Sequence, residues 1–170
     1  LGRSQNISFF HSREVPDDIE TVLKQVRDYE VLSVWKDKAY LHWRYVQHPS
    51  NNYSFHSMYV DNQIVGFAVV RENGYMIAIC EIFHRRKDVK ETELLLRKIM
   101  LHYAKTAAQH MEFYGWDNGF FEAVLLRAGF TMEAFSKTIF CAKMLTDNRM
   151  KEYLLNPFNW TISWGDTDGI

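Results

Sequence analysis

Residues 53–83 read YSFHSMYVDNQIVGFAVVRENGYMIAICEIF, and this stretch decides the fold class. Two pairs of turn-forming residues, Asp61 with Asn62 and Asn73 with Gly74, divide it into three apolar runs of strand length. Apolar side chains alternate onto both faces of the middle run, so helices are expected to cover both sides of the sheet. The stretch therefore predicts an antiparallel meander with strands over 53–60, 63–72 and 75–83.

Helical patterns lie on both sides of this meander. The longest spans residues 90–109, where Leu95, Ile99 and Tyr103 recur at helical spacing. A helix between two strands implies a right-handed crossover, so a parallel strand pair is expected in the sheet. The elements predicted outside the meander are strands over 7–11, 110–116 and 138–145 and helices over 16–27, 37–47, 90–109 and 120–127, the last capped by Asn118 and ended by Gly129.

Composition excludes several classes of protein. The chain has 170 residues, 47% of them hydrophobic, which suits one ordinary domain with a real core. Its formal net charge of −1 gives no general attraction to nucleic acid or to an anionic membrane, and no apolar run approaches the roughly 20 residues that cross a bilayer. Cys80 and Cys141 each lie in an apolar run, which indicates buried thiols in a reducing compartment. We therefore expect a cytoplasmic protein with neither a nucleic-acid nor a membrane partner.

The order of the predicted elements carries a resemblance. Together with Asn118 placed ahead of the pair Gly129 and Phe130, it resembles the GNAT superfamily of N-acyltransferases from the first strand to the last. A narrower likeness, over residues 36–49 and 164–168, is to a subset of bacterial GNAT-like proteins, some of which have tandem domains.

This resemblance implies an α/β (mixed α+β) fold, the GNAT acyl-CoA N-acyltransferase fold. Its central mixed sheet would have about six or seven strands with helices on both faces. Residues 1–170 would form a single domain, with the alternative that they are the C-terminal domain of a longer chain that opens before Leu1. The implied acyl donor is acetyl-CoA, and the implied acceptor is the amine of a small molecule or peptide.

The resemblance also assigns a loop to the cofactor. In the family, a loop at the head of the long helix reads Arg/Gln-x-x-Gly-x-Gly/Ala, and its backbone amides hold the pyrophosphate of acyl-CoA. Aligned through Leu95 and Leu96, this chain has Lys87 at the arginine position. The glycine positions hold Asp88, Lys90 and Thr92. The residues thereby assigned to the cofactor are Ile82, His84, Lys87, Asp88, Val89, Lys90, Glu91, Thr92 and Asn118.

The loop contains both acidic residues, which oppose phosphate binding, and basic residues, which favour it. The carboxylates of Asp88 and Glu91 lie where a pyrophosphate would bind and should repel it. The basic run 84–87 is expected either to offset that loss by attracting the phosphates or to be a solvated loop. Four basic residues without a surrounding basic surface are too few for nucleic acid.

Glu81 is the candidate catalytic residue. It lies on the strand that leads into the loop and would accept a proton from the amine, directly or through water. The alternative is a strand glutamate that is solvated or paired with a neighbour. Many family members protonate the leaving thiolate with a tyrosine, and the matching residue here is Leu125.

Other clusters are weaker. The seven histidines lack the spacing of a metal site, and no metal is expected. The group Trp43, Arg44 and Tyr45 either lines an acceptor pocket or packs against the sheet. Asp166 and Asp168 could bind a cation or complete the acceptor site, although a polar terminal turn is the simpler interpretation.

Two functions remain open from the sequence. The first is an N-acyltransferase that moves an acetyl or other acyl group from coenzyme A to an amine. The second is a non-catalytic GNAT-like binding or regulatory module that has lost productive CoA binding, with an upstream domain or a second copy of the chain as its partner.

Overall fold

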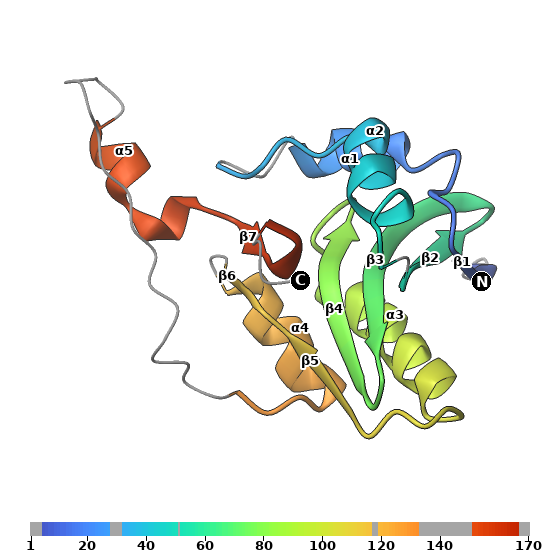
Figure 1. Cartoon of the computed structure of the whole chain (residues 1–170). Helices are drawn as coiled ribbons and strands as arrows, with labels where there is room; N and C mark the ends of the chain where they lie inside the picture. Colours follow the sequence, from blue (N-terminus) through green and yellow to red (C-terminus); the bar gives the residue numbers. More distant parts are fainter. Residues whose placement is uncertain (1–4, 28–31, 51, 117–118, 133–150, 167–170) are drawn as a thin grey trace.

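The computed structural model describes residues 5–27, 32–50, 52–116, 119–132 and 151–166 (Figure 1). A five-stranded sheet forms the centre of the molecule, with the strands in the order β1-β2-β3-β4-β5. All neighbours are antiparallel except β4 and β5, which are parallel. The bounds are β1 (Ile7–Ser12), β2 (Tyr53–Val60), β3 (Gln63–Asn73), β4 (Met76–His84) and β5 (His110–Phe113). The meander and the parallel pair are therefore confirmed.

The strand count is lower than the sequence suggested. Within the described residues the central sheet has five strands, not six or seven. One predicted strand, residues 138–145, lies outside the described residues, as does Cys141. Another, 110–116, is interrupted at Tyr114, so that β6 (Gly115–Trp116) leaves the central sheet and pairs antiparallel with β7 (Ile162–Ser163).

Helices cover both faces of the sheet, as predicted. The first face carries α1 (Glu20–Arg27), α2 (Lys38–Leu41) and the π-helical turn η1 (His42–Val46), which share a buried core with the sheet. The second face carries α3 (Val89–Tyr103) and α4 (Phe120–Ala128) over a second core (Figure 1). The chain then continues through α5 (Lys151–Leu155), η2 (Pro157–Asn159), β7 and η3 (Trp164–Asp166). None of the described helices is both long enough and apolar enough to span a membrane.

Local chemistry explains where two helices differ from expectation. The helix predicted over 90–109 ends at Tyr103, because the Thr106 hydroxyl donates to the Tyr103 carbonyl (2.8 Å) and accepts from the Ala108 amide (3.2 Å). Gly119, with φ of 100°, occupies the N-cap of α4, whereas Asn118 lies outside the described residues. Gly129, also at φ 100°, ends α4 as predicted.

A β-bulge in β4 sets the geometry of the site. Val70 pairs with Ile79 and Val69 pairs with Glu81, so Cys80 is the extra residue. The bulge turns Cys80 and Glu81 toward the same face, the one that α1 and α2 cover. Pairing of β4 with β5 also ends at Ile79. The remaining residues of β4 therefore extend beyond β5 toward the start of α3.

Candidate functional site

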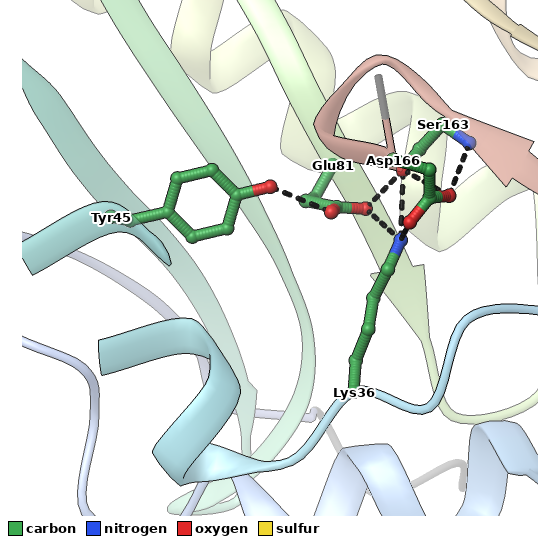
Figure 2. Close-up of polar contacts among 5 residues, drawn as sticks. All are labelled: Lys36, Tyr45, Glu81, Ser163 and Asp166. Carbon is green, nitrogen blue, oxygen red and sulfur yellow. Dashed lines mark hydrogen bonds and ion pairs between the residues drawn. The ribbon is translucent and has the colours of Figure 1, made fainter. Parts of the chain in front are cut away.

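A cluster of polar side chains is buried on the first face of the sheet (Figure 2). Its members are contributed by four separate parts of the chain: Lys36 before α2, Tyr45 in η1, Glu81 in β4, and Ser163 with Asp166 in β7 and η3. The side chains of Lys36, Glu81 and Asp166 are 7%, 1% and 5% exposed. This cluster is therefore shielded from solvent and links the C-terminal segment to the sheet.

Glu81 lies at the centre, and both of its carboxylate oxygens are engaged. Tyr45 donates to Oε1 at 2.7 Å. Lys36 Nζ at 2.8 Å and Ser163 Oγ at 2.6 Å donate to Oε2. Burial raises the pKa of Glu81 and the charge of Asp166 adds to this, while Lys36 opposes it. With three donors on its oxygens, Glu81 is paired with neighbouring side chains. Such pairing was the alternative to a catalytic role for this strand glutamate.

Lys36 forms ion pairs with two carboxylates at once. Its Nζ lies 2.8 Å from Glu81 Oε2 and 2.8 Å from Asp166 Oδ1. It also donates to Ser163 Oγ at 2.9 Å. Burial opposes its charge, but Glu81 and Asp166 outweigh burial and raise the pKa of Lys36 well above its usual value. The ammonium therefore remains charged throughout the physiological range.

Gly165 closes the cluster. A Cβ at this position would collide with the Tyr45 hydroxyl and with the Glu81 carboxylate. Only glycine lets the backbone of η3 lie directly over their hydrogen bond. The backbone of the C-terminal segment therefore packs directly against the Glu81 carboxylate, with no space for a side chain at position 165.

The interpretation of Asp166 as part of a polar terminal turn needs correction. The turn exists as η3, but the Asp166 side chain points inward, where it accepts from the Ser163 amide at 2.8 Å and pairs with Lys36. Asp168 lies outside the described residues. Sequence reasoning also missed Ser163, since no local pattern links a serine near the end of the chain to a glutamate in the central sheet. Among Trp43, Arg44 and Tyr45, Tyr45 is buried in the cluster and Trp43 is 61% exposed.

The loop between β4 and α3 forms a second group of polar residues. His84 Nδ1 accepts from the amides of Arg86 (3.3 Å) and Asp88 (3.1 Å), and its Nε2 lies 2.8 Å from Glu91 Oε2. An acceptor at Nδ1 requires the proton on Nε2, so His84 is the neutral tautomer that donates to Glu91. Burial lowers the pKa of His84, and the nearby Glu91 opposes that shift. Two loop amides are thereby bound to a side chain of the protein itself.

Asp88 engages a further amide at the same place. It is the N-cap of α3, and its carboxylate accepts from the Glu91 amide at 2.9 Å. The Thr92 hydroxyl donates to the Asp88 carbonyl at 2.6 Å. A carboxylate of the chain therefore occupies the position at the helix N-terminus where an external anion would be stabilised.

The structure brings only some of the residues assigned to the cofactor together. His84, Asp88, Glu91 and Thr92 meet at the start of α3 through the contacts above, and Val89 and Lys90 follow in its first turn. Lys87 adopts a left-handed φ of 47° and its Nζ lies 5.8 Å from the Phe120 ring centre, toward α4. The last two are Ile82, which packs in the second core, and Asn118, which lies outside the described residues. The candidate catalytic residue, Glu81, faces the opposite side of the sheet from Ile82.

Solved structures identify the fold. A protein from Desulfovibrio desulfuricans assigned to the GNAT family of acetyltransferases matches with a TM-score of 0.59 and 16% identity, over 76% of this chain and 87% of that one. The chain has the GNAT fold.

Other comparisons are more distant. N-acetylglutamate synthase from Neisseria gonorrhoeae, complexed with coenzyme A and N-acetyl-glutamate, matches with a TM-score of 0.43 and 14% identity over 61% of this chain and 24% of that one. A protein from Staphylococcus epidermidis assigned as an acetyltransferase matches with a TM-score of 0.45 and 9% identity over 71% and 82%. No protein-family model and no curated protein matches the sequence. At these identities the GNAT fold is shown, and activity has to be argued from the site.

Two further observations concern the chemistry of the described side chains. They contain no group of histidine, cysteine, aspartate or glutamate residues that could hold a metal ion. Leu125, which the sequence resemblance aligns with the family's tyrosine, packs against the second core, and its side chain has no proton to transfer. Candidate ligand contacts are therefore the basic loop, the end of β4 and the cavity described below.

Proposed function

We propose that the chain is an N-acyltransferase that moves an acyl group from coenzyme A to an amine. The observation that carries this proposal is the divergence of β4 from β5. Pairing ends at Ile79, yet β4 continues to His84, and among the described strands none pairs with that edge of β4 beyond Ile79. Backbone groups on a free strand edge can hydrogen-bond an extended ligand, and amides near Ile82 could polarise a thioester carbonyl.

The phosphate end of coenzyme A would meet the loop that follows. Arg85, Arg86 and Lys87 offer positive charge there, while Asp88 and Glu91 offer negative charge. Because His84 and Asp88 already engage amides of the loop, a pyrophosphate would have to displace them or bind through side chains alone. We therefore expect the affinity for acyl-CoA to be weak and strongly dependent on salt.

In the proposed reaction, the amine nitrogen attacks the thioester carbon, the carbon–sulfur bond breaks, and coenzyme A leaves as its thiol. Three donors already occupy most of the lone pairs of the Glu81 carboxylate that a base would use. We therefore assign the proton of the amine to water, which passes it to the departing thiolate. Glu81 then acts as a positioning residue that fixes the C-terminal segment beside the end of β4.

A second candidate function has its own support. The internal contacts of His84 and Asp88 suit a non-catalytic module whose loop no longer needs a phosphate to satisfy its amides. Such a domain would keep the GNAT fold and bind another ligand or a partner domain.

Calorimetric titration with acetyl-CoA and with desulfo-CoA, at low ionic strength, separates the two. For the transferase we expect both ligands to bind, Lys87→Ala to weaken them several-fold, and Asp88→Gly to strengthen them several-fold, because the second variant removes a competing carboxylate. Lys24→Ala, which changes an exposed lysine on the opposite face, is the matched control. Absence of heat at millimolar ligand, in the parent and in Asp88→Gly, would exclude the transferase and leave the binding module.

A further inference from the structure

A cavity of about 230 Å³ lies beside the buried cluster, between α1, the segment before α2 and the end of β4. Its walls have an apolar part, from Leu23, Val26, Val34, Trp35 and Phe83, and a polar part, from Arg27, Ser33 and Lys36. Pockets for drug-sized ligands usually measure about 300–1,000 Å³, so this one suits a smaller molecule. Its apolar surface indicates a ligand with an aliphatic or aromatic body.

One cation marks the polar side of this cavity. Arg27 lines it, donates from Nη2 to the Lys36 carbonyl at 2.7 Å, and lies with its guanidinium 4.1 Å from the Trp35 ring centre. These contacts hold the guanidinium in one orientation. Its Nε is buried and has no hydrogen-bond partner among the described residues. A buried donor of this kind requires an acceptor, and a carboxylate is the acceptor that guanidinium geometry favours.

Among the described residues, the other charged side chains around this cavity are either engaged elsewhere or lie outside it. Lys36 also lines the cavity, but its ammonium is committed to Glu81 and Asp166. No carboxylate is among the described residues that line the cavity. Glu20 approaches Arg27 Nη2 from outside at 3.6 Å and is partly exposed, so it screens Arg27 only in part.

We infer that this cavity binds a small carboxylic acid with an apolar body, about the size of a hydrophobic amino acid. Resting on the proposed function, we further infer that such an amino acid is the acyl acceptor. Phe83 belongs both to the cavity wall and to the end of β4, so an acceptor bound here would lie beside the strand edge proposed for the thioester. The reaction would join its amine nitrogen to the acyl carbon and release coenzyme A as the thiol.

Three probes of similar shape test the binding step without coenzyme A: L-phenylalanine, 3-phenylpropionate and phenethylamine, titrated by calorimetry. We expect the two carboxylates to bind roughly tenfold or more tightly than phenethylamine, since charge-assisted hydrogen bonds contribute that much. Arg27→Met should abolish the difference, whereas Lys24→Met, which removes a positive charge from an exposed position on the same helix, should not. Equal binding of phenethylamine and 3-phenylpropionate, or no binding of any probe, would overturn the inference.

A second variant guards against misfolding of Arg27→Met. Val34 is 45% exposed and lines the cavity, so Val34→Trp should fill it without disturbing the core and should abolish binding of both carboxylates. Unchanged affinity in this variant would place the ligand elsewhere and overturn the inference. The acetyl-CoA titration is independent of these results. Carboxylate binding without acetyl-CoA binding would uphold the cavity and exclude the transferase, and the reverse would exclude the cavity alone.

Discussion

Replacing Lys36 by methionine tests whether the buried cluster stabilises the fold. Methionine keeps most of the length of the side chain but removes the ammonium that lies 2.8 Å from both Glu81 and Asp166. Two carboxylates that are 1% and 5% exposed would then face each other without a cation. Removing one partner of a buried ion pair costs about 3–5 kcal/mol, because the remaining charge stays uncompensated.

The measurements are thermal and urea unfolding of the parent, Lys36→Met and the control Lys24→Met, each followed by circular dichroism. A domain of this size loses about 2–4 °C of melting temperature per kcal/mol, so Lys36→Met should melt roughly 6–20 °C lower while the control stays within about 2 °C. A loss below about 1 kcal/mol would refute the reasoning, since it would mean that water reaches the carboxylates.

The pH dependence of this loss gives a second check with a definite sign. Burial raises the pKa of Glu81 above its usual value, and without Lys36 the cation that opposes this shift is lost. A carboxyl with a raised folded-state pKa is least destabilising at low pH, where it is protonated in both states, and the penalty appears as pH rises through the folded pKa. The deficit of Lys36→Met should therefore be larger at about pH 8 than at about pH 5. A deficit that does not change with pH would assign the loss to packing.

Three further predictions follow from other contacts. Gly165→Ala should destabilise the protein by about 1–3 kcal/mol in urea unfolding, because its methyl group overlaps Tyr45 and Glu81; a neutral effect would mean that η3 does not lie on the cluster. Burial and the charges of His11 and His102 lower the pKa of His56 from 6.5 to about 3, so stability present above pH 6.5 should fall on acidification. The loss of unfolding free energy reaches about 2 kcal/mol between about pH 6.5 and about pH 5. When urea unfolding is measured at these two pH values, His56→Gln should lose less stability between them than the parent does. In acetyl-CoA titrations, Leu125→Tyr should leave the affinity unchanged, because Leu125 packs in the second core; a several-fold change would contradict the alignment of α4.

The sequence predicted the meander almost to the residue because strong local signals determine it. Two turn pairs bound the strands, and Asp61 and Asn62 adopt the positive φ values of 48° and 64° that such turns require. The face that Glu81 occupies could not be read in the same way. Residues 77–83 are nearly all apolar, so nothing in the run shows that Cys80 is the extra residue of a bulge. Without the bulge, simple alternation would place Glu81 on the opposite face.

The composition of the buried cluster was beyond sequence reasoning for a different reason. A buried lysine looks like an exposed one until its partners are known, and Lys36 meets Asp166 only because β7 and η3 return to β4. The contacts of the loop between β4 and α3 are easier to predict from the sequence. Asp88 and Glu91 have the spacing of a helix capping box, a signal that predicts an N-cap as well as a repulsive charge.

The amides at the start of α3 can either be capped by side chains of the chain or bind a phosphate, and these two uses exclude each other. This competition bears on the choice between the two proposed functions. An N-terminal helix amide can donate to an internal cap or to a bound phosphate, but a strong bond to one weakens the other. In this chain Asp88 and His84 satisfy three amides of the loop, and that stabilises the domain without ligand. A transferase on this scaffold would therefore rely on the edge of β4 beyond Ile79, which none of the described strands pairs with, for the acyl end of its donor and on Arg85, Arg86 and Lys87 for the phosphate end. Binding that rests on side-chain charge is screened by salt, whereas binding to backbone amides is screened far less, so the salt dependence of the acetyl-CoA affinity distinguishes the two arrangements directly.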